Sequence, residues 1–161
     1  MSLLSTVVDN KKILPYNVEK NKGDLKMQYK IIGQTVPVVE VTLNNGETMY
    51  TQSGGMTYQT DGISMKTNAR GGIMKGIGRV FSGESLFMAN YTAERDGATI
   101  AFATTVPGNI IPVNLSERSN GLTVQKGSFL CAEDSVETSV TFSKKFTAGL
   151  FGGEGFILQK A

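Results

Sequence analysis

Hydrophobic and polar side chains alternate along several short segments of the chain. The alternation is clear in residues 39–43 (VEVTL) and 136–142 (VETSVTF). A period of two places one apolar face on a core and one polar face in water, as in a half-buried β-strand. Residues 83–93 (GESLFMANYTA) are apolar in both phases, which is typical of a central strand that is covered on both sides. Only residues 71–81 have helical spacing.

Turn sequences separate these segments. Asn44-Asn45-Gly46 and Asp61-Gly62 are typical turns, because glycine accepts a positive φ at little cost. Glycine makes up 19 of the 161 residues, well above its usual share of about 7%. Short alternating segments between glycine-rich turns predict an all-β fold, a sandwich or a barrel.

The two halves of the chain resemble each other. Residues 53–56 align with residues 126–129, and after a three-residue contraction FSGESLFM at 81–88 aligns with FGGEGFIL at 151–158. Matching glycine, glutamate and aromatic positions predict a duplicated β-unit of about 70 residues. We therefore expect internally repeated β-sandwich units.

The duplication divides the chain into three parts. We expect an N-terminal extension at residues 1–26, a first β-repeat at 27–108 and a second β-repeat at 109–161, which lacks its closing strand. A sandwich without that strand exposes an edge and an apolar face. Either the chain is part of a longer protein, or a partner subunit or residues 1–30 fill the gap.

Charge is uneven along the chain. The first 30 residues carry six lysines against Asp9, Glu19 and Asp24, whereas the remainder is close to neutral. Nucleic-acid-binding domains usually have a concentrated basic face, so we expect no strong nucleic-acid binding. The extension is either a solvated tail or the source of an additional strand from its apolar residues 3–8.

The residue inventory excludes several kinds of chemistry. With no His and a single cysteine, Cys131, the chain cannot form a Ser–His–Asp or Cys–His catalytic site, a His-ligated metal site, an intrachain disulfide or a cysteine-based cluster. We expect no metal and no cofactor. Cys131 lies in the run FLCA and is predicted to be a small buried hydrophobic residue. No stretch approaches the ~20 apolar residues of a membrane span, and a lone thiol fits a reducing compartment, so we expect a soluble cytoplasmic protein.

Glu84 and Glu154 occupy equivalent places in the two motif copies, directly after Gly83 and Gly153. One interpretation is a carboxylate pair for hydrolysis, which requires a separation of about 5–10 Å. The other is that each carboxylate accepts hydrogen bonds from nearby backbone N–H groups and fixes a corner. Repeat-related carboxylates have similar surroundings, whereas acid and base roles need different ones. We therefore expect a structural role and no catalytic residue.

Residues 71–81 place Ile77 and Phe81 on one helical face and Lys75 and Arg79 on another. One interpretation is a basic amphipathic segment whose four residues contact anionic lipid or another anion. The spacing is neither a dinucleotide fingerprint nor a P-loop. The interpretation that we favour is a connector whose apolar face caps the sandwich.

Longer stretches of the chain resemble a known family, the Aim twenty-four family. That family is named for a yeast mitochondrial biogenesis protein and is widespread in bacteria as proteins of unassigned activity. The stretches that carry the resemblance are MQYKIIGQTVPVVEVTL at 27–43, GGIMKGIGRVFSGESLFMANYTA at 71–93, PGNIIPVNL at 107–115, GLTVQKGSFLCAEDSVE at 121–137 and GLFGGEGFILQK at 149–160.

The resemblance implies a fold similar to that of the tryptophan RNA-binding attenuation protein (TRAP) superfamily, with repeated β-sandwich units, no established catalytic residue and no known cofactor. RNA binding and tryptophan binding belong to the namesake of the superfamily and are not carried over. Members of the family usually continue with another copy of the motif, which this chain lacks, and residues 1–26 have no counterpart.

From these observations we expect a non-enzymatic binding or assembly module that acts through sheet edges and apolar faces. A homo-oligomer or a protein partner fits best, because copies of the same unit satisfy unpaired edges. Two alternatives remain, a peripheral membrane protein that uses residues 71–81 and a carboxylate-dependent hydrolase.

Overall fold

The computed structural model describes residues 2–7, 19–20, 27–69, 87–118, 120–125, 127–142 and 154–160. Apart from one short 3₁₀ turn, η1 (Leu115–Glu117), the regular elements of these residues are all strands, which confirms the all-β prediction. The strands are β1 (Ser2–Val7), β2 (Glu19–Lys20), β3 (Gln28–Ile32), β4 (Val38–Leu43), β5 (Thr48–Gln52), β6 (Met56–Gln59), β7 (Ile63–Ala69), β8 (Phe87–Ala93), β9 (Ala98–Ala103), β10 (Asn109–Asn114), β11 (Leu122–Gln125), β12 (Phe129–Glu133), β13 (Val136–Phe142) and β14 (Glu154–Lys160).

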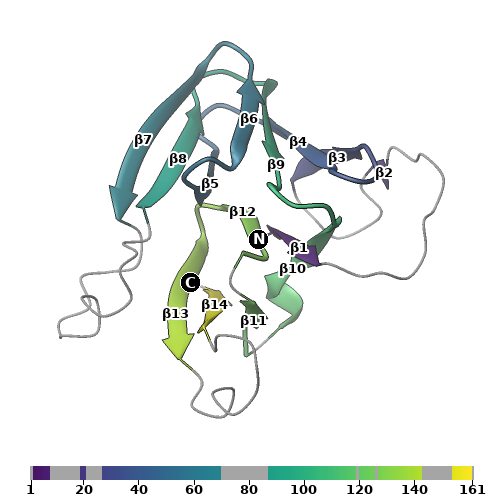
Figure 1. Ribbon diagram of the computed structural model, residues 1–161. Coiled ribbons are helices and arrows are strands. Elements are labelled where there is room, and N and C mark those ends of the chain that lie inside the picture. Colours follow the sequence, from purple (N-terminus) through teal and green to yellow (C-terminus); the bar gives the residue numbers. More distant parts are fainter. Residues whose placement is uncertain are drawn as a thin grey trace.

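The described strands form three antiparallel sheets (Figure 1). The six-stranded sheet has the order β10-β1-β12-β5-β8-β7, the five-stranded sheet β2-β3-β4-β9-β6 and the three-stranded sheet β11-β14-β13. β5 pairs directly with β12, so strands from the two predicted repeats join in one sheet. Among the described residues there is no helix with the length and apolar content that a membrane crossing requires.

The first hydrophobic core lies between the six-stranded and the five-stranded sheets. Val39, Val41 and Leu43 of β4 are buried and alternate with half-buried neighbours, as their period of two predicts. Across the core, the ring of Tyr91 on β8 meets the ring of Phe102 on β9 edge to face, with centroids 6.2 Å apart. Such edge-to-face contacts add to the stability that burial provides.

A second core covers the opposite face of the six-stranded sheet. It contains Tyr50, Met88, Leu115, Phe129, Ala132 and Val136, with Leu122 and Val124 of the three-stranded sheet packed against it. Successive residues of one strand therefore enter different cores: Met88 lies in the second and Ala89 in the first. This arrangement confirms the prediction of a central strand that is covered on both sides, for residues 87–93.

The N-terminal extension contributes a strand to the six-stranded sheet. β1 pairs antiparallel with β10 along its whole length and with β12 on its other side. The extension also supplies β2, which pairs with β3 at the edge of the five-stranded sheet. Residues 2–7 thus lie between two strands that are more than 100 positions away in the sequence.

Strand pairing corrects part of the sequence alignment between the two halves. β14 lies between β11 and β13 as β8 lies between β5 and β7. The motif alignment matches Leu158 with Met88, whereas the pairing gives Leu158 the position of Tyr91. Tyr91 pairs with Met49 and Met65, and Leu158 pairs with their aligned counterparts, Leu122 and Thr138.

The alignment is therefore wrong at this strand. The connections before the two strands differ in length by more than the three-residue contraction that the alignment contains. Residues 70–86 precede β8, whereas only residues 143–153 precede β14. Hydrogen bonding to two neighbouring strands sets the register, and a slip by an odd number of residues turns every side chain to the other face.

Candidate interaction surface

Most of the site residues predicted from the sequence lie outside the described residues. These are Gly83, Glu84 and Gly153 of the paired motif and Lys75, Ile77, Arg79 and Phe81 of the proposed lipid or anion contact. Glu154 begins β14, where it pairs with Phe142. Neither the hydrolase nor the lipid interpretation therefore gains a described contact.

The edge strands of the two larger sheets differ in how they are protected. β10 contains Pro112, which has no N–H group to offer, and β2 is only two residues long. β6 has an irregular register at Thr57, where it pairs with β9. β7 has seven residues, no proline and a continuous register with β8. Natural proteins protect edges with proline, bulges, short strands or charged side chains. Of these devices β7 carries only the exposed Lys66, so within the described residues it is the open edge of these two sheets.

The backbone phase of β7 follows from one hydrogen bond. Glu94 N–H donates to the carbonyl of Gly62 at 2.8 Å, at the start of the β7–β8 ladder. In an antiparallel ladder, hydrogen-bonded pairs alternate along the strand. The even-numbered residues of β7 therefore direct their backbone groups toward β8. Those of Ile63, Met65 and Thr67 point outward, where no described strand pairs with β7; the outward carbonyl of Ile63 accepts a hydrogen bond from the Gln59 side chain at 3.2 Å.

Met65 brings apolar surface to this edge. It lies in one row with Met49 and Tyr91, across β5, β8 and β7. Met49 is fully buried and Tyr91 is 5% exposed, whereas Met65 is 56% exposed, the largest value among the large hydrophobic residues described. The core-facing row of the six-stranded sheet thus continues to the open edge of the sheet. Exposed apolar surface next to outward-facing backbone groups, such as those of Met65 and Thr67, is suited to pairing with another strand.

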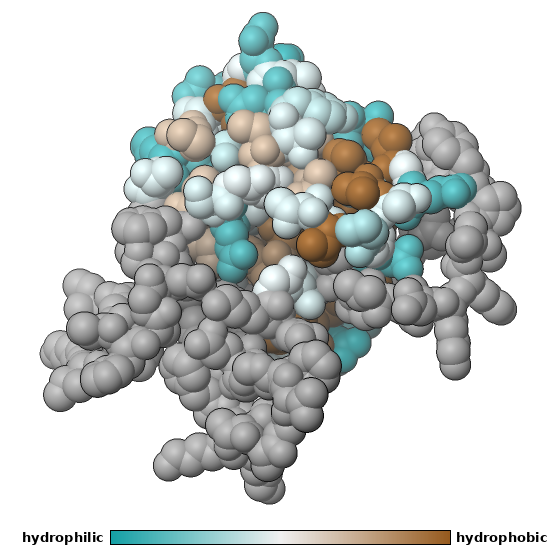
Figure 2. Space-filling model, in the orientation of Figure 1, coloured by the Kyte–Doolittle hydropathy of each residue, from teal (hydrophilic) through white to brown (hydrophobic). Residues whose placement is uncertain are grey.

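Other exposed hydrophobic residues gather at loops far from β7 in the sequence. Val36 and Val106 are about half exposed, at 48% and 49%. Their loops are joined by a hydrogen bond from Gly108 N–H to the carbonyl of Thr35, at 3.1 Å. Figure 2 shows that strongly hydrophobic side chains of the displayed face are grouped rather than evenly spread. These loops form a second apolar surface.

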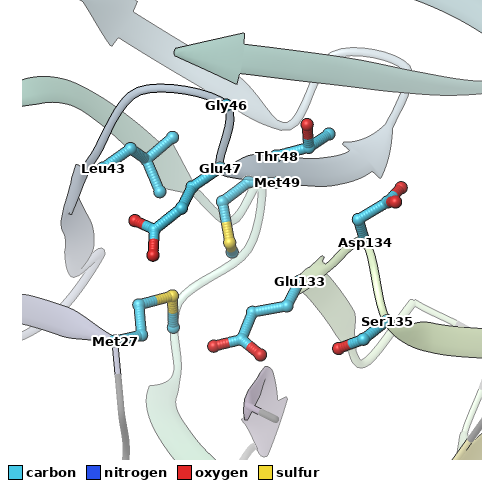
Figure 3. Close-up of a pocket in the computed structure, with 9 residues that line it drawn as sticks. All are labelled: Met27, Leu43, Gly46, Glu47, Thr48, Met49, Glu133, Asp134 and Ser135. Carbon is cyan, nitrogen blue, oxygen red and sulfur yellow. The ribbon is translucent and has the colours of Figure 1, made fainter. Parts of the chain in front are cut away.

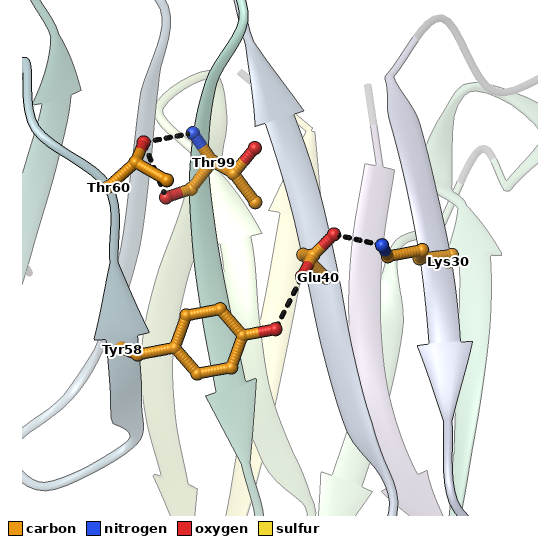
Figure 4. Close-up of polar contacts among 5 residues, drawn as sticks. All are labelled: Lys30, Glu40, Tyr58, Thr60 and Thr99. Carbon is orange, nitrogen blue, oxygen red and sulfur yellow. Dashed lines mark hydrogen bonds and ion pairs between the residues drawn. The ribbon is translucent and has the colours of Figure 1, made fainter.

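A row of polar contacts crosses the outer face of the five-stranded sheet (Figure 4). The ammonium group of Lys30 pairs with the carboxylate of Glu40, which also accepts a hydrogen bond from the hydroxyl of Tyr58. Ala101 of β9 pairs with both Glu40 and Tyr58, so the tyrosine side chain reaches across β9 above a small, fully buried residue. At the end of β6, Thr99 N–H donates to the hydroxyl of Thr60, at 2.9 Å.

These contacts fix the protonation of both acidic groups. The hydrogen bond from Lys30, and then that from Tyr58, lowers the pKa of Glu40 from its ordinary value of 4.5. The hydrogen bond to Glu40 raises the pKa of Tyr58 to about 12. Near neutral pH the carboxylate is charged and the phenol is protonated, so each group keeps the form that its hydrogen bonds require and the row holds neighbouring strands together.

An open hollow of about 330 Å³ lies where the β4–β5 hairpin meets the turn between β12 and β13 (Figure 3). Glu47 accepts a hydrogen bond from Asn44 N–H at 2.8 Å, which closes the hairpin. Asp134 N–H donates to the carbonyl of Thr48 at 3.0 Å, which ties the second turn to β5. All the ionisable groups of the lining are carboxylates, so the hollow carries negative charge and no Lys or Arg of the described residues lines it. The lining consists of Met27, Leu43, Gly46, Glu47, Thr48, Met49, Glu133, Asp134 and Ser135.

Cys131 is completely buried, as predicted, in the first core. Burial raises the pKa of its thiol well above the ordinary value of 9.0, which keeps the thiol protonated and unreactive. Within the described part of the chain, no three His, Cys, Asp or Glu side chains come together as a metal site. The feature of this surface that sequence reasoning missed is the β7 edge, although ISMKT at residues 63–67 alternates as a strand does.

Comparison with known proteins gives consistent matches. Residues 29–161 match the family described as Mitochondrial biogenesis AIM24. The Uncharacterized protein M6_Spy0233 from Streptococcus pyogenes serotype M6 is 30% identical over 151 residues, which cover 89% of this chain and 59% of that protein. The crystal structure of protein SPYM3_0169 from Streptococcus pyogenes is similar, with a TM-score of 0.54 and 27% identity, covering 84% of this chain and 65% of the other. The chain thus spans about three fifths of the length of these relatives.

Proposed function

Since the chain belongs to the Mitochondrial biogenesis AIM24 family, whose compared member is uncharacterized, we propose that it is a non-enzymatic assembly module. Its partner is a protein, in the first place a second copy of the same chain, and the contact is made through the open edge of β7. The cytoplasm is the proposed compartment, because the unpaired, buried thiol of Cys131 suits a reducing environment.

The observation that carries the proposal is the outward-facing backbone of Ile63, Met65 and Thr67 beside the exposed Met65 side chain. Two copies related by a two-fold axis at Met65 form an antiparallel pair, in which each β7 extends the six-stranded sheet of the other. In this register Lys66 lies opposite Ser64 of the second copy, so no like charges meet. A two-fold contact of this kind uses the same patch on both partners and is closed.

The contact has a limited strength. Three outward-facing residues on each copy form roughly six backbone hydrogen bonds, and each contributes about 0.5–1.5 kcal/mol in net terms. Association also costs several kcal/mol of lost translational and rotational freedom. We therefore expect a reversible dimer that responds to protein concentration and to any change at the edge.

The test removes one outward-facing donor without touching the intrachain ladder. Thr67→Pro eliminates an N–H group that points away from β8, and Thr67→Val keeps this N–H group as a matched control. Analytical ultracentrifugation over a range of concentrations is expected to show a dimer for the unchanged chain and for Thr67→Val, and clearly weaker dimerisation, with a several-fold higher dissociation constant, for Thr67→Pro. A chain that is monomeric throughout, or a Thr67→Pro variant that dimerises as well as Thr67→Val, contradicts the proposal.

A further inference from the structure

The strands around β1 repeat the arrangement of the strands around β9. β9 lies between β4 and β6 in the five-stranded sheet, and β1 lies between β10 and β12 in the six-stranded sheet. Both central strands are antiparallel to both neighbours. β1 therefore occupies, in the second half of the molecule, the position that the closing strand β9 occupies in the first.

The correspondence extends to a single irregular residue. β6 skips Thr57 where it pairs with β9, since Met56 faces Phe102 while Tyr58 faces Ala101. β12 skips Leu130 where it pairs with β1. The alignment of residues 53–56 with 126–129 places Thr57 at Leu130. Bulges are specific features of a strand pair, so the walls formed by β10 and β12 are built, like β4 and β6, to receive a strand between them.

The two closing strands differ in how they are attached. β9 follows β8 directly after the turn at residues 94–97, which fixes it beside its own unit. β1 ends at Val7, and the chain continues to β2, which belongs to a different sheet. The fraction of time that β1 spends between β10 and β12 therefore depends on the effective concentration that this longer connection provides, because no tight turn holds β1 there. A strand that is not fixed to its neighbours by a tight turn is an element that identical chains can exchange at low cost.

We propose that the slot between β10 and β12 is a strand-acceptor site and that residues 2–7 are its ligand, exchanged between two copies so that each closes the slot of the other. An empty slot leaves backbone N–H and C=O groups without partners along both walls, which is costly where they are buried. The slot takes an extended segment of about six residues without proline, bound through main-chain hydrogen bonds. This exchange does not depend on β7.

The position of Cys131 makes it possible to measure directly which segment lies between β10 and β12. Leu4 pairs with Cys131, the only cysteine of the chain. Residues directly opposite each other in an antiparallel pair present their side chains on the same face, at a distance that a disulfide can bridge. Leu4→Cys therefore joins β1 to β12 on oxidation. Leu3→Cys is the matched control, because Leu3 pairs with Ala132 and neighbouring residues of a strand point to opposite faces.

Both variants are refolded with a glutathione redox pair at low and at high protein concentration and then compared on non-reducing gels and by intact mass. For Leu4→Cys we expect an intrachain disulfide in dilute samples and an interchain disulfide that increases at least several-fold with concentration. Leu3→Cys is expected to form neither product efficiently. An intrachain product alone at every concentration overturns exchange, and no excess of either product over Leu3→Cys overturns residues 2–7 as the ligand.

The same oxidation in a Thr67→Pro background separates this inference from the β7 contact. The interchain product of Leu4→Cys is expected to persist there, whereas its loss would show that the link came from association at β7 and would overturn exchange. A second experiment tests exchange without cysteine variants. Isotopically labelled and unlabelled Thr67→Pro chains are mixed, unfolded and refolded together, and the products are analysed by native mass spectrometry. Mixed dimers support exchange, and exclusively monomeric chains contradict it.

Discussion

The hydroxyl of Tyr50 offers a sharp test of how the second core is fastened. Tyr50 lies on β5 in the six-stranded sheet, is fully buried, and stacks on Phe129 with ring centroids 5.7 Å apart. Its hydroxyl donates a hydrogen bond of 2.7 Å to the carbonyl of Val136, at the start of β13 in the three-stranded sheet. Tyr50→Phe removes this bond between two sheets and keeps the ring.

The expected loss of stability follows from the burial of both groups that form the bond. Val136 is 1% exposed, so its carbonyl loses the tyrosine hydroxyl where water has little access. A buried group left without a partner costs about 1–3 kcal/mol. For a chain of this length, each kcal/mol lowers Tm by about 2–4 °C. Tyr58→Phe is the matched control, because it also removes one hydroxyl, but from a side chain that is 42% exposed, where water can replace the lost hydrogen bond to Glu40, so its cost should be smaller, about 0.5 kcal/mol.

Urea unfolding followed by far-ultraviolet circular dichroism measures both variants, since the chain has no Trp to serve as a fluorescent probe. The midpoint is expected to fall clearly for Tyr50→Phe and to remain close to that of the unchanged chain for Tyr58→Phe. Equal midpoints for the two variants would refute the reasoning, because they would mean that the bond between β5 and β13 does not stabilise the folded chain.

Three further predictions concern named side chains. Glu40→Gln is expected to reduce the difference in stability between neutral and acidic pH. The lowered pKa of Glu40 gives a contribution to stability that is present above pH 4.5 and is lost as the pH falls through the folded-state pKa. Urea midpoints at pH 3 and pH 7 measure this difference. Thr138→Val is expected to stabilise the chain by about 1 kcal/mol, because the buried hydroxyl has no hydrogen-bond partner among the described residues, and Tm should rise. Gly62→Ala is expected to destabilise the chain on the order of 1–3 kcal/mol, more than Gly46→Ala does. Both glycines have a positive φ, 83° and 84°, but a Cβ at Gly62 would lie 2.7 Å from the side chain of Arg95, whereas one at Gly46 meets nothing within 4 Å. A larger fall in Tm for Gly46→Ala would contradict this prediction.

The sequence predicted the features that depend on local pattern. Alternation in residues 39–43 gave the buried face of β4, and the two-phase apolar run gave a strand covered on both sides. Gly46 and Gly62 have the positive φ that their turn sequences predict. Each of these features is a property of a few consecutive residues, because side-chain direction in a strand and φ in a turn are set locally.

The features that depend on pairing between distant strands were harder to predict. Met65 alternates like any strand residue, and only the position of β7 at the end of a sheet exposes it. The equivalence of Leu158 with Tyr91 is set by hydrogen bonding to two neighbours, while the Gly-Glu motif suggested another register. The sequence left open whether residues 1–30 supply a strand, because nothing local to residues 2–7 names β10 and β12 as neighbours.

The position of β1 has a consequence for the order in which the chain acquires its structure. During synthesis residues 2–7 leave the ribosome long before the strands that receive them, because β10 and β12 are translated only after residue 108. This segment must therefore wait, unpaired, while about 100 further residues emerge, and such distant pairing slows folding. Nascent chains on the same messenger RNA carry the same unpaired segment, so residues 2–7 of one chain can compete for the position between β10 and β12 of another.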